Sequence, residues 1–426
     1  MSVPLFTLAP NLTVSRLCLG TMTFGEQNSL SQSLRLLDQA FDAGINFFDS
    51  AEMYPVPQRA ETQGKSEEYF GQWVRKRKIS RDRVVIATKV AGPSGQMSWI
   101  RDGPKCLDAK NITEAVDGSL KRLQMDHIDL YQIHWPDRFV YSSYPLFISL
   151  GDSLGLWSCH FKTKCVNREQ ISDFCRYCNK YFRFSFFSSF FLYNTGAVIL
   201  KCFTVVSPAM FPCLEKPSMI QSDNSHLSQL RSNLMLLAEL LMLIRYIGLS
   251  NETPYGVMKF LHFAENNVCY PKIISVQNSY SLLCRTFDSG MAECCHHERI
   301  YLLGYSPLAM GILSGKYFAS DGAPSDARLN LFKGRYSEGE SRYSLARNTL
   351  KLATMEYLGI AEKYGLHPVS LAIAFVLNHP LVASTVFGVT KSWQLEEVIS
   401  ACNVELTSEV IADINKVHAK FPNPCP

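Results

Sequence analysis

Four side chains in the first third of the chain suit proton transfer and stand where a fold could bring them together. Asp49, Lys89 and His134 each close a short apolar run. Tyr54 follows Asp49 by five residues, in a loop that contains proline. Because a nearby ammonium favours phenolate, we expect Lys89 to lower the pKa of Tyr54. A carboxylate would hold the ammonium and an imidazole would orient a carbonyl oxygen, so the set is typical of a site that protonates an oxygen while another group delivers hydride.

Composition excludes several other kinds of protein. The chain has 426 residues, of which 47% are hydrophobic and 19% charged, as in ordinary globular proteins. A formal charge of +4 is too small to predict a nucleic-acid groove or a polybasic membrane contact. The first ten residues resemble neither a signal peptide nor a transit peptide, so we expect a cytoplasmic protein. The 14 cysteines are then expected to be reduced thiols.

Strand-like and helix-like segments alternate along the chain. The predicted strands are 17–20, 46–49, 84–89, 128–134, 246–249, 273–278, 300–305 and 385–387. Helical spacing of apolar residues predicts helices over about 30–41, 67–77, 111–123, 254–264, 368–377 and 395–402. Gly44 is a C-terminal cap signal, Asn111 is the expected cap of the third helix, and Thr253 with Pro254 opens the fourth.

Repeated strand-then-helix units predict a parallel sheet, and eight of them predict a closed (β/α)₈ TIM barrel, typically of roughly 250 residues plus extensions. In such barrels the chemistry lies at the carboxyl ends of the strands. Asp49, Lys89 and His134 end the second, third and fourth predicted strands and would therefore face one mouth. A doubly wound dinucleotide fold is disfavoured because the glycines Gly20 and Gly25 lack the required spacing.

Short motifs in the same order resemble the aldo-keto reductase family, in particular its Tas-like branch related to potassium-channel β-subunits. They are Leu19-Gly-Thr-Met-Thr-Phe24, Asp49-Ser-Ala-Glu-Met-Tyr54, Thr88-Lys89, His134-Trp-Pro136, Gly248-Leu-Ser-Asn251, Gln277-Asn-Ser-Tyr280, Tyr305-Ser-Pro-Leu308, Gly311-Ile-Leu-Ser-Gly-Lys-Tyr317 and Phe387-Gly-Val-Thr-Lys-Ser-Trp-Gln-Leu-Glu396. The resemblance covers residues 1 to about 140 and 244–426. It implies one barrel domain over residues 1–426 that binds NADPH without a separate dinucleotide domain.

The resemblance also implies a role for individual residues. Tyr54 would be the general acid of carbonyl reduction, with Lys89 and Asp49 tuning it and His134 orienting the substrate carbonyl. The implied cofactor residues are Gly20, Thr21, Met22, Asp49, Ser250, Asn251, Gln277, Tyr305, Ser306, Pro307, Leu308, Lys316, Arg328, Gly388, Thr390, Gln394 and Glu397.

Among these, Ser250, Asn251 and Gln277 would hold the nicotinamide carboxamide, and Tyr305 would stack on its ring. Lys316 and Arg328 would bind phosphate, although either residue alone could equally be a solvated surface charge. The chain departs from the family at Val398, where Asn is frequent, and at Gly304, where Ala is usual.

One long segment breaks the alternation. Residues 140–243 separate the fourth and fifth predicted strands, where other crossovers need a few tens of residues, so we expect an atypical, poorly ordered insertion. Its Phe, Ser and Leu bias favours a translated intron or a shifted reading frame. Sequencing the transcript tests this hypothesis, because a single ordinary exon in a uniform frame would contradict it.

Three other interpretations of the insertion remain open. Phe184–Leu200 is just long enough for a membrane span but is interrupted by polar residues, so we expect none. Partial zinc spacing occurs among Cys159, His160, Cys165, Cys175 and Cys178, without a second pair to complete it. Leu234–Ile244 could form an apolar outer helix.

Two functional classes remain open. The chain could be an active NADPH-dependent reductase of small carbonyl substrates, or a nucleotide-binding regulatory or catalytically impaired relative of such enzymes. The adjacent Cys294, Cys295, His296 and His297 cannot all face one ion, so we expect no metal site there. The sequence leaves the substrate and the oligomeric state undetermined.

Overall fold

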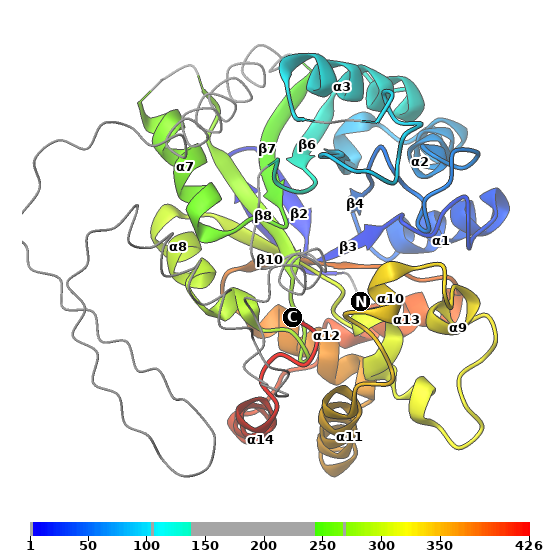
Figure 1. The fold of residues 1–426 in the computed structure, drawn as a ribbon, viewed down its shortest axis with the longest axis vertical. Helices are drawn as coiled ribbons and strands as arrows, with labels where there is room; N and C mark the ends of the chain where they lie inside the picture. The colour runs from blue at the N-terminus through cyan, green and yellow to red at the C-terminus, as the bar shows by residue number, and fades with distance from the viewer. Residues whose placement is uncertain (1–2, 104–105, 138–242, 267–269) are drawn as a thin grey trace, which may run out of the picture. The chain divides into compact units, whose positions relative to one another are not determined.

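Eight parallel strands close into a barrel at the centre of the computed structural model (Figure 1). The structure describes residues 3–103, 106–137, 243–266 and 270–426. Around the barrel the strands follow the order β10-β3-β4-β5-β6-β7-β8-β9, and every neighbouring pair is parallel. The barrel strands are β3 (Leu17–Gly20), β4 (Phe47–Asp49), β5 (Val85–Val90), β6 (Ile128–Ile133), β7 (Ile244–Ser250), β8 (Ile273–Ser279), β9 (Tyr301–Tyr305) and β10 (Val382–Phe387). The predicted (β/α)₈ barrel is confirmed.

Some predicted strand ends differ from the observed ones. His134 lies just beyond β6, which ends at Ile133. Ile244 opens strand β7, so the predicted apolar helix 234–244 is wrong at its last residue. Apart from Leu243, the rest of that helix and of the insertion lies outside the described residues, and so do the segment weighed as a membrane span and the partial zinc spacing.

A hairpin that the periodicity did not predict closes the amino-terminal end of the barrel. Strands β1 (Leu5–Ala9) and β2 (Leu12–Ser15) pair antiparallel. Leu8, Leu12 and Val14 pack into one buried cluster with inward-facing residues near the strand starts, among them Phe47 and Val85. The hairpin leaves the carboxyl ends of the strands as the open mouth.

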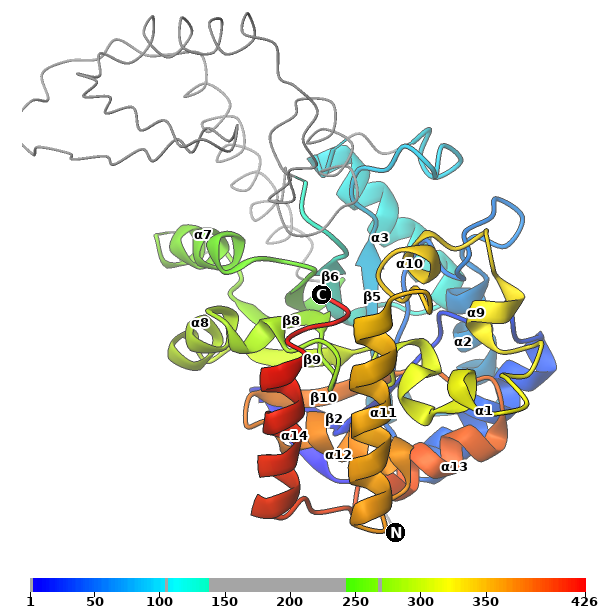
Figure 2. The same ribbon diagram turned by 60° about the horizontal axis from the view of Figure 1, so that its bottom comes forward.

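Helices surround the strands (Figure 1). The longer ones are α1 (Leu30–Asp42), α2 (Lys65–Lys76), α3 (Ala109–Leu123), α7 (Pro254–Glu265), α8 (Met291–Glu298), α11 (Asn348–Lys363), α12 (Pro368–Asn378), α13 (Ser392–Ala401) and α14 (Ser408–Lys420). Two short helices, α9 (Arg328–Leu331) and α10 (Ser337–Glu340), follow β9. Helices α11 and α14 lie side by side, joined by the ion pairs Lys363–Asp413 and Lys420–Glu356 (Figure 2).

Capping residues account for several helix ends. Gly44 adopts a positive φ of 95° directly after the C-cap of α1, as its cap signal predicted. Thr253 caps α7 with Pro254 in the first turn, also as predicted. The predicted cap of α3 is wrong: Asp108 is the N-cap, and its carboxylate accepts from the Asn111 N–H at 2.8 Å. Asn111 therefore lies inside the first turn.

A buried polar network attaches α2 and α3 to strand β5. Glu67 on α2 is fully buried. Its carboxylate accepts hydrogen bonds from the Thr88 hydroxyl at 2.6 Å and from the Arg122 guanidinium on α3 at 2.6 Å. Thr88 directly precedes Lys89. The network therefore holds the strand from which Lys89 projects.

Two helical glycines provide a matched test of this packing. A Cβ on Gly71 of α2 would lie 2.1 Å from the Leu123 carbonyl oxygen, whereas a Cβ on Gly359 of α11 meets nothing within 4 Å. We predict that Gly71→Ala lowers the free energy of unfolding by about 1–3 kcal/mol, because rigid backbone must move. Gly359→Ala should raise it by about 0.5–1 kcal/mol through helix propensity. Urea denaturation of both variants measures the difference; a destabilised Gly359→Ala or an unaffected Gly71→Ala would contradict this packing.

Candidate functional site

The four residues singled out from the sequence meet at the carboxyl end of the barrel. Asp49 ends β4, Lys89 lies near the end of β5, and His134 follows β6 directly. Tyr54 stands in the loop after β4, and its ring lies 5.0 Å from the Lys89 ammonium and 5.6 Å from the His134 ring. All four side chains are at most 8% exposed.

A buried ion pair forms the base of this site. The Lys89 ammonium lies 2.5 Å from Asp49 Oδ1 and donates a second bond to the Ser50 carbonyl at 2.8 Å. The other Asp49 oxygen accepts from Gln277 Nε2 at 2.8 Å and from Gln132 Nε2 at 3.2 Å. Every charged atom of the pair therefore has a partner, as buried charges require.

The charge state of Lys89 follows from that pairing. Burial lowers the pKa of the Lys89 ammonium, but Asp49 and Tyr54 together raise it by more, so the net shift is upward. Lys89 thus stays charged beside Tyr54.

The pKa of Tyr54 differs from the sequence-based expectation. Burial raises the pKa of the phenol, and the Lys89 charge reverses only part of that effect, so the pKa lies above its ordinary value. The expectation of a lowered pKa is wrong for this structure, because desolvation of a buried phenolate outweighs one ammonium. The phenol is accordingly protonated at neutral pH, which is the state that a general acid needs.

His134 is held as a neutral imidazole. Burial, with Lys89 adding to it, lowers the pKa of His134 well below its ordinary value. Its Nδ1 is buried and has no hydrogen-bond partner among the described residues. Its backbone is fixed on both sides, since its N–H donates to the Val90 carbonyl at 3.0 Å and its carbonyl accepts from Asn251 Nδ2 at 2.8 Å. A neutral ring in this position can offer one N–H to a carbonyl oxygen.

The residues predicted to hold a nicotinamide carboxamide lie beside the ion pair and bond to one another. Ser250 donates from its hydroxyl to the Gln277 carbonyl at 2.9 Å. Tyr305 donates from its phenol to Asn251 Oδ1 at 2.8 Å. Gln277 reaches Asp49, as described above. The structure therefore brings these four predicted residues together at the mouth.

The predicted phosphate-binding residues lie on the long segment between β9 and α11, which includes α9. It begins with Ser306, Pro307 and Leu308, and Ser306 has a φ of 57°. The Lys316 side chain packs against Gly311, since a Cβ added at Gly311 would lie 2.9 Å from Lys316 Nζ. Burial lowers the pKa of the Lys316 ammonium. The Arg328 guanidinium lies 5.3 Å from the Tyr336 ring, and its Nε is buried without a partner among the described residues.

Residues predicted for the adenosine end cluster where β10 meets helix α13. Gln394 Oε1 accepts from the Thr390 N–H at 2.9 Å, so Gln394 caps this turn. Glu397 Oε1 lies 3.9 Å from His367 Nε2. Val398 is buried in the main hydrophobic core. The Val398 side chain has no donor or acceptor for a hydrogen bond to an adenine ring.

The remaining predicted cofactor residues line neighbouring strand ends. A Cβ on Gly20 would lie 3.2 Å from the Phe387 carbonyl oxygen, and Gly388 follows β10 directly. Thr21 bonds to the Asp49 carbonyl through both its N–H and its hydroxyl. Met22 packs against the apolar cluster that contains Tyr54.

Sequence reasoning missed a second buried ion pair behind Tyr54. Glu52 accepts from the Arg101 guanidinium and, at 2.6 Å, from the Ala91 N–H. Burial raises the pKa of Glu52 even though Arg101 opposes that shift. The pair joins the loop after β5 to the loop that carries Tyr54. Its only sequence signal was the position of Glu52 inside the Asp49–Tyr54 motif, and nothing marked Arg101.

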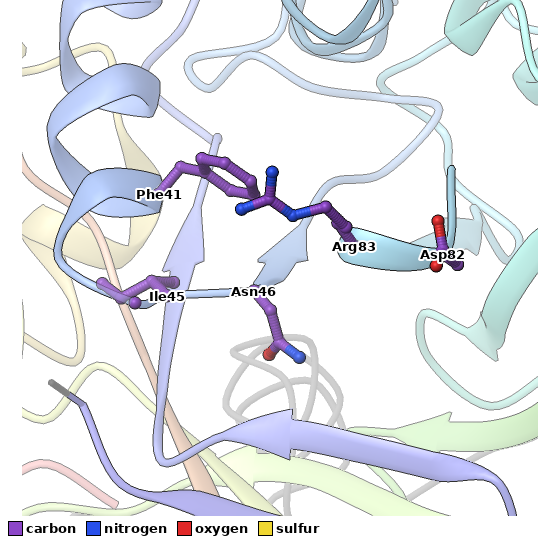
Figure 3. A pocket seen from close by; sticks show the side chains of 6 residues that line it. Phe41, Ile45, Asn46, Asp82 and Arg83 are labelled. Carbon is purple, nitrogen blue, oxygen red and sulfur yellow. The ribbon is translucent and has the colours of Figure 1, made fainter. Parts of the chain in front are cut away.

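A pocket of about 210 Å³ lies at the other end of the barrel and is separate from this site. It is lined by Phe41 at the end of α1 and by residues just before strands β4 and β5, namely Gly44, Ile45, Asn46, Asp82 and Arg83 (Figure 3). The Arg83 guanidinium covers the Phe41 ring at 4.8 Å. None of these residues belongs to the site at the mouth.

The described residues contain no group of three or more His, Cys, Asp or Glu arranged to hold a metal ion. In the same residues no single helix is long and apolar enough to cross a membrane, although α11 and α12, which meet at an angle of 97°, reach that length and apolar character together.

Comparisons with known proteins agree with this geometry. The model of the aldo/keto reductase family matches residues 16–419. Protein tas of Escherichia coli (strain K12) is 38% identical over 418 residues, which cover 98% of this chain and 97% of that protein. An aldo-keto reductase of Babesia bovis is 33% identical, with 80% of this chain and 98% of that protein covered. A probable voltage-gated potassium channel subunit beta of Oryza sativa subsp. japonica is 26% identical, with 96% and 95% covered.

The depressed pKa of His134 gives a testable pH dependence. We predict that its ring does not titrate between about pH 6 and about pH 8, where a free imidazole does. The unfolded chain binds the proton more readily, so His134 should reduce the stability of the fold as pH falls below about 6.5. Histidine-labelled NMR of the native and denatured protein measures the first effect, and urea denaturation of His134→Gln across pH the second. An imidazole that titrates near its ordinary pKa in the native protein would contradict this assignment.

Proposed function

This chain belongs to the aldo/keto reductase family, and we propose that it reduces the carbonyl group of a small aldehyde or ketone with NADPH, using Tyr54 as the general acid. The observation that carries the proposal is the buried arrangement of Tyr54 between the charged Lys89 and the neutral His134. A protonated phenol and an imidazole N–H would both point to one carbonyl oxygen, while Asp49 holds the ammonium in place. We also propose that the protein acts in the cytoplasm.

The residues around the mouth fit an NADPH cofactor. When bound, it supplies the hydride for the reduction. Ser250, Asn251 and Gln277 offer amide and hydroxyl groups to a carboxamide, and Tyr305 offers a ring. Lys316 and Arg328 are cations on the adjoining segment after β9, and the buried Arg328 Nε, which has no partner among the described residues, suits an anion such as a phosphate. The adenosine end would lie along Gly20–Met22, Gly388, Thr390, Gln394 and Glu397.

During the reaction the protein's own groups would control one proton. His134 would orient the carbonyl oxygen toward the Tyr54 hydroxyl. Tyr54 would donate its proton as negative charge develops on that oxygen, and the Lys89 ammonium would stabilise the resulting phenolate. The apolar side chains of Met53, Met97 and Ile100, which pack with Tyr54, would exclude water from this step.

A second candidate is a nucleotide-binding regulatory protein with weak catalysis. The similarity to a probable channel β-subunit favours it. NADPH titration followed by an aldehyde assay separates the two candidates, because binding without turnover favours the regulatory one.

We predict that Tyr54→Phe lowers kcat by about 10²–10⁴ because it removes the proton donor. NADPH binding should be nearly unchanged, since the phenol hydroxyl lies outside the predicted nucleotide groove. Turnover of an aromatic aldehyde and a fluorescence titration measure the two quantities. Tyr69→Phe on α2 serves as the matched control. A Tyr54→Phe protein with normal kcat would refute the assignment.

We also predict that NADPH binds more tightly than NADH, because charge-assisted bonds to the extra phosphate are absent with NADH. Lys316→Met and Arg328→Met should each reduce that preference by about tenfold. Lys333→Met, an exposed lysine on the same segment, is the control. Equal dissociation constants of the wild-type protein for both nucleotides would count against these two roles.

A further inference from the structure

The phenol of Tyr305 joins two hydrogen bonds of opposite direction. Its oxygen lies 2.8 Å from Asn251 Oδ1 and 3.4 Å from Arg342 Nη1. A guanidinium can only donate, so the Tyr305 oxygen accepts from Arg342 and its single proton goes to Asn251. Burial raises the pKa of Tyr305 to about 12, against an opposing effect of Arg342, so the hydroxyl keeps that proton.

The orientation of the Asn251 amide agrees with this direction. With Oδ1 turned to Tyr305, the amide nitrogen faces the His134 carbonyl at 2.8 Å and the Ser250 hydroxyl at 3.2 Å. If the amide were flipped, Oδ1 would oppose the His134 carbonyl oxygen, and two acceptors would meet. The His134 carbonyl therefore fixes the amide with Oδ1 toward Tyr305, and the donation by Arg342 leaves the Tyr305 proton directed at that oxygen.

Arg342 is itself held in place from its far side. Its Nε donates to the Cys425 carbonyl at 3.3 Å, and its Nη2 lies 3.6 Å from Cys284 Sγ. The Cys425 N–H in turn donates to the Leu283 carbonyl at 3.0 Å. The hydrogen bonds of Arg342 to described residues all go to uncharged acceptors, and no function assigned above uses this residue. Its guanidinium therefore bridges segment 423–425, the loop after β8 and Tyr305.

We propose that Arg342 is a positioning residue for carbonyl reduction, acting through the Tyr305 hydroxyl on Asn251 and the His134 backbone. The proposal rests on the proposed function, which assigns Tyr305 and Asn251 to the nicotinamide side of the site. A fixed Asn251 amide keeps the Tyr305 ring and the end of β6 in one arrangement. Loss of Arg342 would let the Tyr305 hydroxyl rotate away from Asn251 Oδ1, and this would weaken the bond that ties the Tyr305 ring to Asn251 and, through Asn251, to the end of β6.

A double-mutant cycle tests the route of this effect. We expect Arg342→Met and Tyr305→Phe each to lower kcat by about tenfold, with a smaller rise in the dissociation constant of NADPH. The double variant should lose no more than the worse single variant, because both changes remove the same bond. Arg342→Lys should recover part of the loss, since an ammonium can still donate to the Tyr305 oxygen.

Arg347 supplies the matched control. Its Nη1 donates to the Pro424 carbonyl at 3.3 Å, so Arg347→Met removes a neighbouring contact to the same segment but leaves Tyr305 untouched. We expect normal kcat for that variant. Losses that multiply in the double variant, or an Arg347→Met protein as slow as Arg342→Met, would overturn the proposal.

The same set of proteins separates this proposal from the proposed function. Wild-type protein that binds NADPH but turns over no carbonyl would refute the reductase, and the cycle would then be read from the NADPH dissociation constants. Additive changes in those constants would refute the role of Arg342. If thermal melting shows that Arg342→Met does not fold, Arg342→Lys replaces it in the cycle. The decrease in kcat caused by Arg342→Lys must then disappear in a protein that already carries Tyr305→Phe.

Discussion

The buried ion pair of Lys89 and Asp49 is the constraint on which the rest of the site depends. Two charges at most 2% exposed are costly to remove from water, and they persist only if every polar atom finds a partner. The partners are Ser50 directly after β4, Gln132 on β6 and Gln277 on β8. Together with Lys89 on β5, the network therefore joins four strands. Closing the barrel in its observed register is what supplies them, so the site and the fold stabilise each other.

Two further buried pairs extend this arrangement outward. Glu67 with Arg122 holds α2 and α3 against the strand that carries Lys89. Glu52 with Arg101 joins the Tyr54 loop to the loop after β5. Since a buried charge without its partner is destabilising, each pair tolerates little movement of the elements it joins. The mouth is therefore rigid where Tyr54 and Lys89 meet, which is a condition for proton transfer over a short distance.

Burial determines the electrostatics of the site more than the formal charges do. Tyr54 and His134 both sit near the Lys89 ammonium, yet desolvation is the largest influence on each pKa. It keeps the phenol protonated and the imidazole neutral, so that two neutral donors face one region of the mouth. The Lys89 ammonium is then available to stabilise negative charge that develops on a nearby oxygen in the mouth.

Short-range patterns in the sequence determined the alternation of strands and helices, and from it the barrel. They also predicted that Asp49, Tyr54, Lys89 and His134 would lie together, because parallel strands bring their carboxyl ends to one edge wherever the helices between them lie. Local spacing was less reliable at helix ends: Asp108 rather than Asn111 caps α3, since both are good caps and only the backbone path decides.

Only the tertiary structure decided the depth of burial and the partners that are distant along the chain. The upward pKa shift of Tyr54 depends on how much water the surrounding loops exclude, which no local pattern records. Arg101 and Arg342 carry no motif, and they matter because the fold places them beside Glu52 and Tyr305. Periodicity tells which face of an element is buried, whereas long-range packing alone tells what that face meets.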